Sequence, residues 1–458
     1  MLWFFRVGVS YVPRRISAFS WAFDIVLLGM QLAAQRSNAL EYGTIYGIIN
    51  GSCSMPKEPA LLPKDIRPTD ILTATHFATV FPLSEVRAVL ESCGRSTVRV
   101  RNFPNEGVIY FVMMLALFRD CAHREVFRII ADALKQLWRK RKIVIPTAAA
   151  LSQARTRVGF EPFQILFERL AVPVAVESTK GAWFKGLRKI AIDGCLLNTD
   201  DSKENRNYFG CSKNQHKTAS SFPQARFVGL LEISTHLFFK AVIGGYHDGE
   251  ITLGKQLIRY LTKGMILLAD RNFYSFDFFQ SVKDTGSEFV VRIQRGMKFT
   301  SVEQLPDHSD IVLLHPSNNK EKRPGIRARL IQYRVLGSNE KVYLLTTILD
   351  PQKASAQELA ELYHERWEYE GALKQLKTVL NDSATTLRSK TPALVIQELW
   401  GLLMTHYVVS LNMFRAASRA DLDPDELSFK HSVHVISRSV YKATSDFSPC
   451  EQIEEDFE

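Results

Sequence analysis

Two apolar segments that each contain an aspartate near their end constrain the fold of this chain more than any other feature. They are LRKIAIDG (187–194) and GMILLADRNF (264–273), and both have the length and composition of buried strands. Between them, 226–244 holds two more strand-like runs, and 251–261 has the apolar spacing of a helix. This order of three strands, a helix and a further strand predicts an α/β domain.

The two aspartates are candidate site residues because of where their strands are expected to end. Asp193 and Asp270 each follow an apolar run, and ligands of open α/β sheets bind at the carboxyl ends of the strands. Taken singly, each is more often a turn residue, since an Asp after a strand readily caps the next turn. The acidic segment 247–250 is likewise interpreted as a turn before a helix.

The segment after the second aspartate changes character. Residues 275–286 read as a helix that stops at a glycine, and 288–349 contains four strand-like runs separated by polar turns. The sequence therefore predicts a β-rich insertion, with the α/β domain resuming in the helical segment 355–380.

The region before the α/β domain is helical and basic. From 95 to 142 there are 11 Lys/Arg and four Asp/Glu, a net of +7, within a chain of net charge +10. This density favours a surface that contacts phosphates, although a solvated helix end is the simpler alternative. Six cysteines without a C-x-x-C pair argue against a zinc ribbon or a disulfide scaffold.

The N-terminal segment is interpreted as a loosely attached extension. Residues 16–34 are apolar, but Asp24 interrupts the run and makes a membrane span a poor interpretation. Four prolines between 50 and 69 indicate a linker, and Met55 is an alternative start. The apolar run 107–118 is too short for a span and is expected to be a buried helix.

The helix predicted over 355–380 carries the third candidate carboxylate. Ser355 and Glu358 form a capping box that fixes its start. At about 100° per residue, the helix aligns one stripe of polar side chains and turns a separate apolar face to the core. The stripe comprises Tyr363, Arg366, Glu370 and Lys377, flanked by Trp367 and Lys374, and the core face comprises Leu362, Tyr369, Leu373, Leu376 and Leu380. A solvated face with i,i+4 ion pairs is the alternative.

Three carboxylates beside basic side chains suit metal-dependent phosphoryl transfer. Divalent hard cations take oxygen ligands, and a two-metal site stabilises the attacking and leaving oxygens of an in-line displacement. Arg and Lys beside the acid would grip DNA phosphates. The stripe on the helix supplies both kinds of group.

These residues resemble a known family. The spacing Y-x2-R-x3-E-x6-K (363–377) resembles the signature of bacterial insertion-sequence DDE transposases. So do I-D-G around Asp193, A-D-R-x-F-Y around Asp270, and four further segments, so that the resemblance covers about 75–415. The further segments are VRVRNFP (98–104), SQARTRVG (152–159), LRSKTP (387–392) and QELWGLL (397–403).

The resemblance implies a fold, a metal and a site. It implies an RNase H-like catalytic domain with a β-rich insertion, preceded by an all-helical DNA-binding domain. Asp193, Asp270 and Glu370 would be the catalytic residues and the ligands of two Mg²⁺, with Mn²⁺ as a substitute. The candidate DNA-binding residues are Tyr363, Arg366, Lys377, Lys374, Trp367 and Arg271 near the carboxylates, and Arg99, Arg101, Arg139, Lys140, Arg141 and Lys142 in the helical region.

The predicted organisation follows from the same resemblance. The parts are an N-terminal extension (1–70), a helical DNA-binding domain (71–160), a catalytic core in two parts (185–287 and 351–415), a β-rich insertion (288–350) and a C-terminal tail (416–458). Some relatives carry in the insertion a Trp that stacks on a flipped base, whereas 271–366 here contains none. Phe289, Phe299, Tyr333 and Tyr343 are the candidate substitutes.

The implied function is cut-and-paste DNA transposition, with DNA hairpins as one route of end release. The implied partners are the double-stranded terminal inverted repeats of the element, the target DNA and a second copy of the chain in the DNA complex. The expected location is the bacterial cytoplasm in association with the nucleoid, with no membrane partner. Three alternatives stay open: an inactive DNA-binding remnant, a related nuclease that cuts without joining, and a membrane-associated protein.

Overall fold

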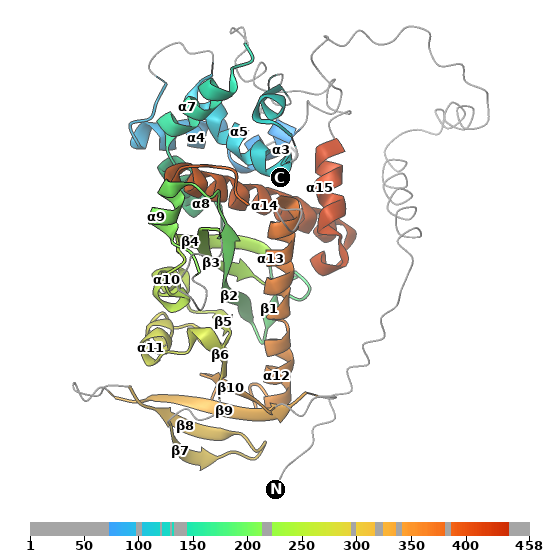
Figure 1. Cartoon of the computed structure of the whole chain (residues 1–458). Helices are drawn as coiled ribbons and strands as arrows, with labels where there is room; N and C mark the ends of the chain where they lie inside the picture. The colour runs from blue at the N-terminus through green and yellow to red at the C-terminus, as the bar shows by residue number, and fades with distance from the viewer. Residues whose placement is uncertain are drawn as a thin grey trace, which may run out of the picture. The chain divides into compact units, whose positions relative to one another are not determined.

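The fold is described from a computed structural model of the chain (Figure 1). The described ranges are 73–97, 103–119, 121–128, 131, 144–212, 222–294, 299–316, 324–335, 341–380 and 386–438, and they belong to one compact unit. The predicted extension 1–70, Met55 and the six basic candidates between 99 and 142 lie outside these ranges.

The first half of the sheet has the strand order β4-β3-β2-β5-β6. Neighbouring strands run antiparallel from β4 to β2 and parallel from β2 through β5 to β6. The bounds are β1 (Trp183–Phe184, paired with β2), β2 (Leu187–Asn198), β3 (Gln224–Glu232), β4 (Leu237–Gly245), β5 (Met265–Ala269) and β6 (Glu288–Ile293). Three antiparallel strands followed by two parallel ones form an RNase H-like sheet, so the predicted fold class is confirmed.

The β-rich region continues this sheet. Strand β10 pairs antiparallel with β6 through Thr346 opposite Val290, and β9, β8 and β7 follow outward. Their bounds are β7 (Phe299–Gln304), β8 (Asp310–Leu314), β9 (Ile326–Arg334) and β10 (Lys341–Thr346). Side chains of the outermost strand, β7, are mostly exposed, as befits an edge strand.

Helices cover both faces of the sheet. Ile190 and Ile192 of β2 pack in the same apolar cluster as α10 (Glu250–Leu257) and α11 (Phe276–Asp284). Because side chains alternate along a strand, Ala191 faces the other way. It belongs to the apolar cluster that includes α12 (Ala356–His364) and α13 (Trp367–Leu380). Figure 1 shows these two groups of helices on opposite sides of the strands.

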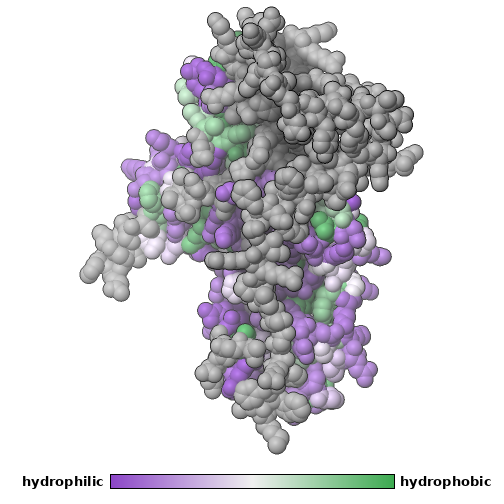
Figure 2. Space-filling view, turned by 90° about the vertical axis from the view of Figure 1, so that its right-hand side faces the viewer, coloured by the Kyte–Doolittle hydropathy of each residue, from purple (hydrophilic) through white to green (hydrophobic). Residues whose placement is uncertain are grey.

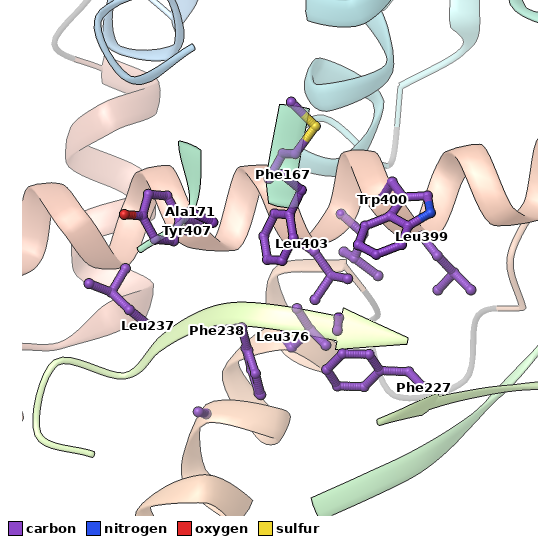
Figure 3. Packing of buried hydrophobic residues seen from close by; sticks show 14 of the residues in the cluster. Phe167, Ala171, Phe227, Leu237, Phe238, Leu376, Leu399, Trp400, Leu403 and Tyr407 are labelled. Carbon is purple, nitrogen blue, oxygen red and sulfur yellow. The ribbon is translucent and has the colours of Figure 1, made fainter. Parts of the chain in front are cut away.

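Helix α14 (Pro392–Ala420) joins the sheet to the N-terminal helices. Trp400 packs against Phe167 of α8 with ring centroids 5.5 Å apart, and Figure 3 shows both above Phe227 and Phe238 of the sheet. Among the described residues, α14 has the length and apolarity of a membrane span, but its apolar window is 94% buried. It is therefore a core helix.

The N-terminal helices share the same core. Helix α5 (Asn105–Leu117) is almost wholly buried, which confirms the helix predicted over 107–118. The other helices of this region are α3 (Thr73–Val80), α4 (Leu83–Ser92), α7 (Ala148–Val158) and α8 (Glu161–Leu170). After α14, the short helix η4 (Pro424–Glu426) and α15 (Phe429–Arg438) also pack onto the protein, with Phe429 and Ile436 buried.

A buried arginine connects three segments that were singled out in the sequence. Arg155 donates hydrogen bonds to Gln397 Oε1 at 2.9 Å, Ser389 Oγ at 3.0 Å and the Leu394 carbonyl at 3.0 Å. The segments SQARTRVG, LRSKTP and QELWGLL therefore meet at one point, where α7 is fixed to α14. In the described structure these contacts hold the N-terminal helices on α14.

Candidate active site

The two aspartates lie side by side because of the register of two parallel strands. Ile192 of β2 is opposite Ala269 of β5, and the next residue on each strand is Asp193 or Asp270. Asp193 shares its face of the sheet with Ala191, so its side chain lies toward α12 and α13.

The prediction that Asp193 ends its strand is wrong. Strand β2 continues to Asn198, and Asp193 pairs with Gly229 in the middle of it. The pairing with β3 continues beyond the point where β5 ends. From Asp193 onward, β2 therefore has a strand partner on the β3 side but none from β5. Asp270 does follow the end of β5, and its Oδ1 accepts a hydrogen bond from the Asn272 N–H at 2.8 Å.

The helix of the third carboxylate is interrupted, contrary to the single helix predicted over 355–380. Helix α12 (Ala356–His364) begins with the predicted capping box, and α13 (Trp367–Leu380) follows a turn at Glu365 and Arg366. In that turn the Arg366 N–H bonds to the Tyr363 carbonyl three residues back, so the backbone is wound more tightly than an α-helix.

Arg366 connects two of the three carboxylates. Its Nη1 lies 3.1 Å from Asp193 Oδ2, and its Nη2 lies 3.1 Å from Glu370 Oε1. Only 8% of Arg366 is exposed. The same guanidinium lies within 6 Å of the ring centroids of Tyr363 and Trp367, at 5.9 and 5.8 Å. The described structure thus brings most of the predicted stripe together around one cation.

A buried tyrosine fixes α13 to strand β2. Tyr369 was predicted only to face the core, and it is fully buried. Its hydroxyl also donates to the Asp193 carbonyl at 2.6 Å and to the Gly229 carbonyl at 3.2 Å. The sequence offered one signal for this contact, a polar hydroxyl on an otherwise apolar helix face.

Glu250 is a fourth acid beside the site that sequence reasoning treated as part of a turn. Asp248 does cap that turn, since its Oδ2 accepts from the Gly245 N–H at 2.6 Å. Glu250 begins α10 and pairs with Arg226 at 2.6 Å. A Cβ on Gly194 would lie 3.1 Å from the Glu250 side chain, so the glycine after Asp193 makes room for this acid.

The electrostatics of the site fit a bound cation. Burial raises the pKa of Asp193 to about 7, and the nearby carboxylates of Asp270 and Glu250 add to the rise, against the Gly194 N–H and Arg366. Three carboxylates from β2, β5 and α13 form an oxygen donor set that suits hard divalent cations. A cation there would relieve the repulsion between them.

The remaining predicted DNA contacts that lie within the described ranges are exposed. Lys374 and Lys377 lie on the surface of α13, and Arg271 directly follows Asp270. Trp367 is 61% exposed, which is unusual for an indole in a folded domain. Figure 2 shows the side on which α12 and α13 lie, and its described surface is largely hydrophilic.

The chain matches known proteins across this same region. Residues 72–168 match the family described as Insertion element 4 transposase N-terminal, and residues 185–408 match the Transposase DDE domain. The chain is 30% identical over 366 residues to the Escherichia coli (strain K12) transposase InsG for insertion sequence element IS4, covering 77% of this chain and 79% of that protein. It is 28% identical over 214 residues to the putative transposase InsZ of the same strain, covering 47% and 69%.

A solved structure of a piggyBac transposase synaptic complex with hairpin DNA resembles the chain with a TM-score of 0.44 and 11% identity, covering 84% of each chain. The RNase H-like sheet, its carboxylates and the domain matches define a DNA-binding DDE transposase. The chain belongs to the IS4 family of these enzymes.

Proposed function

We propose that this transposase binds the terminal inverted repeats of an insertion sequence, cleaves the ends and joins them to target DNA. The observation that carries the proposal is the Arg366 guanidinium between Asp193 and Glu370, with Asp270 next in register. That arrangement gathers three acids from distant parts of the chain at one partly exposed position. Water is the first nucleophile and the freed 3′-OH of the DNA is the second, with hairpin ends as one route of release.

Asp193, Asp270 and Glu370 would hold two Mg²⁺, with Mn²⁺ as a substitute. Bound ions would activate the attacking oxygen and offset the charge that develops on the phosphate. Tyr369 supports this role because it fixes α13, which carries Glu370, to the strand that carries Asp193. The positive charge of Arg366 offsets the negative charges of Asp193 and Glu370 and so reduces the electrostatic repulsion between the two carboxylates.

The DNA would lie along α12 and α13. Arg366, Lys374 and Lys377 offer cations to phosphates, with Arg271 beside Asp270. Trp367 is exposed enough to stack on a base, and Tyr363 lies beneath the same guanidinium. Arg99, Arg101, Arg139, Lys140, Arg141 and Lys142 would contact the element end from the helical region.

The domain organisation, assembly and location are part of the proposal. The helical region 71–160 would bind element ends, 185–287 and 351–415 would form the catalytic core, and 288–350 would form the insertion. Because two ends must be joined, the active complex would contain two copies of the chain. It would act on nucleoid DNA in the bacterial cytoplasm.

Cleavage of DNA that carries the element ends tests the proposal. The wild type is expected to nick the 3′ strand at the end in Mg²⁺ or Mn²⁺. Asp193→Asn, Asp270→Asn and Glu370→Gln are expected to bind the same DNA without cutting it. Glu361→Gln, an exposed acid on the neighbouring turn of α12, is the matched control and should cut normally.

The outcome also separates the alternatives. A wild type that binds the ends and never cuts them would be the inactive remnant. A wild type that cuts but does not join would be the related nuclease. Cutting that survives all three carboxylate substitutions would remove the proposed site.

A further inference from the structure

A second group of side chains that could hold a metal ion lies on the other side of α13. His236 comes from the turn between β3 and β4, Glu368 from the first turn of α13, and Asp425 from η4. Their potential ligand atoms all lie within 4.8 Å of one another. Glu368 precedes Glu370 by two positions, so the two side chains lie about 200° apart around the helix. This cluster is therefore separate from the catalytic carboxylates.

The distances within the cluster leave room for one ion. His236 Nε2 lies 2.9 Å from Asp425 Oδ1 and 3.8 Å from Glu368 Oε2. Ligands about 2.0–2.2 Å from a tetrahedral zinc ion are roughly 3.3 Å apart, which falls between these two distances. Side-chain exposure rises from 10% for His236 to 22% for Glu368 and 36% for Asp425, so an ion can enter from the Asp425 side.

The buried imidazole lacks the hydrogen bond that its surroundings should provide. His236 is 8% exposed, and its Nε2 has no hydrogen-bond partner despite the nearby Asp425 oxygen. Buried polar atoms are normally satisfied, and a ring nitrogen directed at two carboxylates is a usual metal ligand.

The second ring nitrogen has the partner that a metal ligand requires. His236 Nδ1 lies 3.0 Å from the Gln375 amide nitrogen, while Gln375 Oε1 is buried without a partner. Exchanging the amide oxygen and nitrogen, which are nearly indistinguishable by shape, gives Oε1 a hydrogen bond from Nδ1–H. Nε2 then presents its lone pair to the carboxylates. Metal-bound histidines usually donate their other N–H in this way.

We propose that His236, Glu368 and Asp425 form a second divalent-metal site that takes Zn²⁺, with water in the fourth position. One imidazole and two carboxylates suit a borderline cation of this kind. The Glu368 carboxylate is already oriented, because its Oε2 accepts from the Ser234 N–H at 2.7 Å. The ion would tie the β3–β4 turn and η4 to the helix that carries Glu370. This inference does not rest on the proposed function.

The competing interpretation is an ion-pair network without metal. A doubly protonated His236 could donate to Gln375 and Asp425, and Lys189 lies within electrostatic range of Glu368 and Asp425. Lys189 is itself paired with Glu365. The two interpretations differ in whether the folded chain takes up an ion at this position.

Zinc stoichiometry distinguishes them. The full-length chain without an affinity tag, carrying Asp193→Asn, Asp270→Asn and Glu370→Gln, is equilibrated with Zn²⁺ in millimolar Mg²⁺ and then dialysed. The expected result is one zinc per chain. The X-ray absorption spectrum of that zinc should show nitrogen and oxygen ligands and no sulfur. Addition of Zn²⁺ should also raise the melting temperature.

Substitutions locate the ion. His236→Asn and Asp425→Asn should each lose the zinc and the rise in melting temperature, whereas the exposed His315→Asn should keep both. Asp425→Asn tests the site independently in case the variant of the buried His236 does not fold. Far-ultraviolet circular dichroism checks that both variants are folded. No bound zinc, or zinc retained by folded His236→Asn and Asp425→Asn proteins, would overturn the proposal.

Discussion

The hydroxyl of Tyr369 donates a 2.6 Å hydrogen bond to the backbone carbonyl of Asp193. This bond joins α13 to β2 at Asp193, one of the three proposed catalytic carboxylates, and a second bond from the same hydroxyl reaches β3 at Gly229. The helix that carries Glu370 is thereby held against the strand that carries Asp193.

Tyr369→Phe is expected to weaken both stability and cleavage. The substitution keeps the ring but leaves two buried carbonyls without this donor, and such a loss costs about 1–3 kcal/mol. Chemical denaturation and the cleavage rate check the prediction. Tyr208→Phe, at a side chain that is 60% exposed, is the control. Unchanged stability and rate in Tyr369→Phe would show that the bond does not position the site.

Arg366→Lys is expected to reduce cleavage even though it preserves the charge. A single ammonium cannot reproduce the guanidinium fork that reaches Asp193 and Glu370 together. Loss of one charged hydrogen bond is worth about 1.5–3 kcal/mol, which corresponds to roughly a 10- to 100-fold lower rate. Single-turnover cleavage at saturating DNA measures this. Wild-type rates in the Lys variant would mean that charge alone suffices.

Lys374→Ala and Lys377→Ala are expected to weaken DNA binding uniformly across sequences. Both side chains are exposed on α13, and each phosphate contact adds about 1 to the slope of log affinity against log salt. Titrations at several salt concentrations should show that slope fall by about 1 for each variant. Lys353→Ala, an exposed lysine before α12, should leave it unchanged. An unaltered slope in the α13 variants would exclude these contacts.

Acid is expected to destabilise the fold through a buried histidine. Burial lowers the pKa of His406 from 6.5 to about 3. Between these values the unfolded chain binds the proton and the folded chain does not, so stability falls as pH drops below 6.5. The loss is about 1.4 kcal/mol per pH unit.

Denaturation of wild type and His406→Leu from pH 7 to pH 5 checks this. Below pH 6.5, the free energy of unfolding of the variant should fall by about 1.4 kcal/mol less per pH unit than that of the wild type, whatever its absolute stability. Equal slopes for the two proteins would contradict the assignment.

Local patterns in the sequence predicted much of this site. The apolar run before Asp270 and the capping box at Ser355 depend on neighbouring residues, and the structure has both of them. The predicted core face of the Glu370 helix is also buried at Leu362, Tyr369, Leu373 and Leu376, while the side chain of Leu380 lies outside the described residues. The mid-strand position of Asp193 depends instead on pairing with β3, which begins some thirty residues later in the chain. No local pattern encodes it.

The turn at Glu365 and Arg366 also could not be predicted from local sequence patterns. Neither residue is a glycine or proline, so nothing in the sequence signals an interruption. The meeting of Arg155 with Ser389 and Gln397 is a tertiary contact between segments more than 200 residues apart. The family resemblance marked those segments without saying that they touch.

Joining of pre-cleaved ends is the sharpest test of DNA transposition by this chain, because it separates strand transfer from binding and from the first cut. A duplex that ends in the exposed 3′-OH of the element is incubated with a supercoiled plasmid, the protein and Mg²⁺. We expect covalent insertion by the wild type and none by Glu370→Gln, with equal binding of the duplex by both. Insertion by Glu370→Gln at the wild-type rate, or none by a wild type that binds the ends and cuts them, would contradict it.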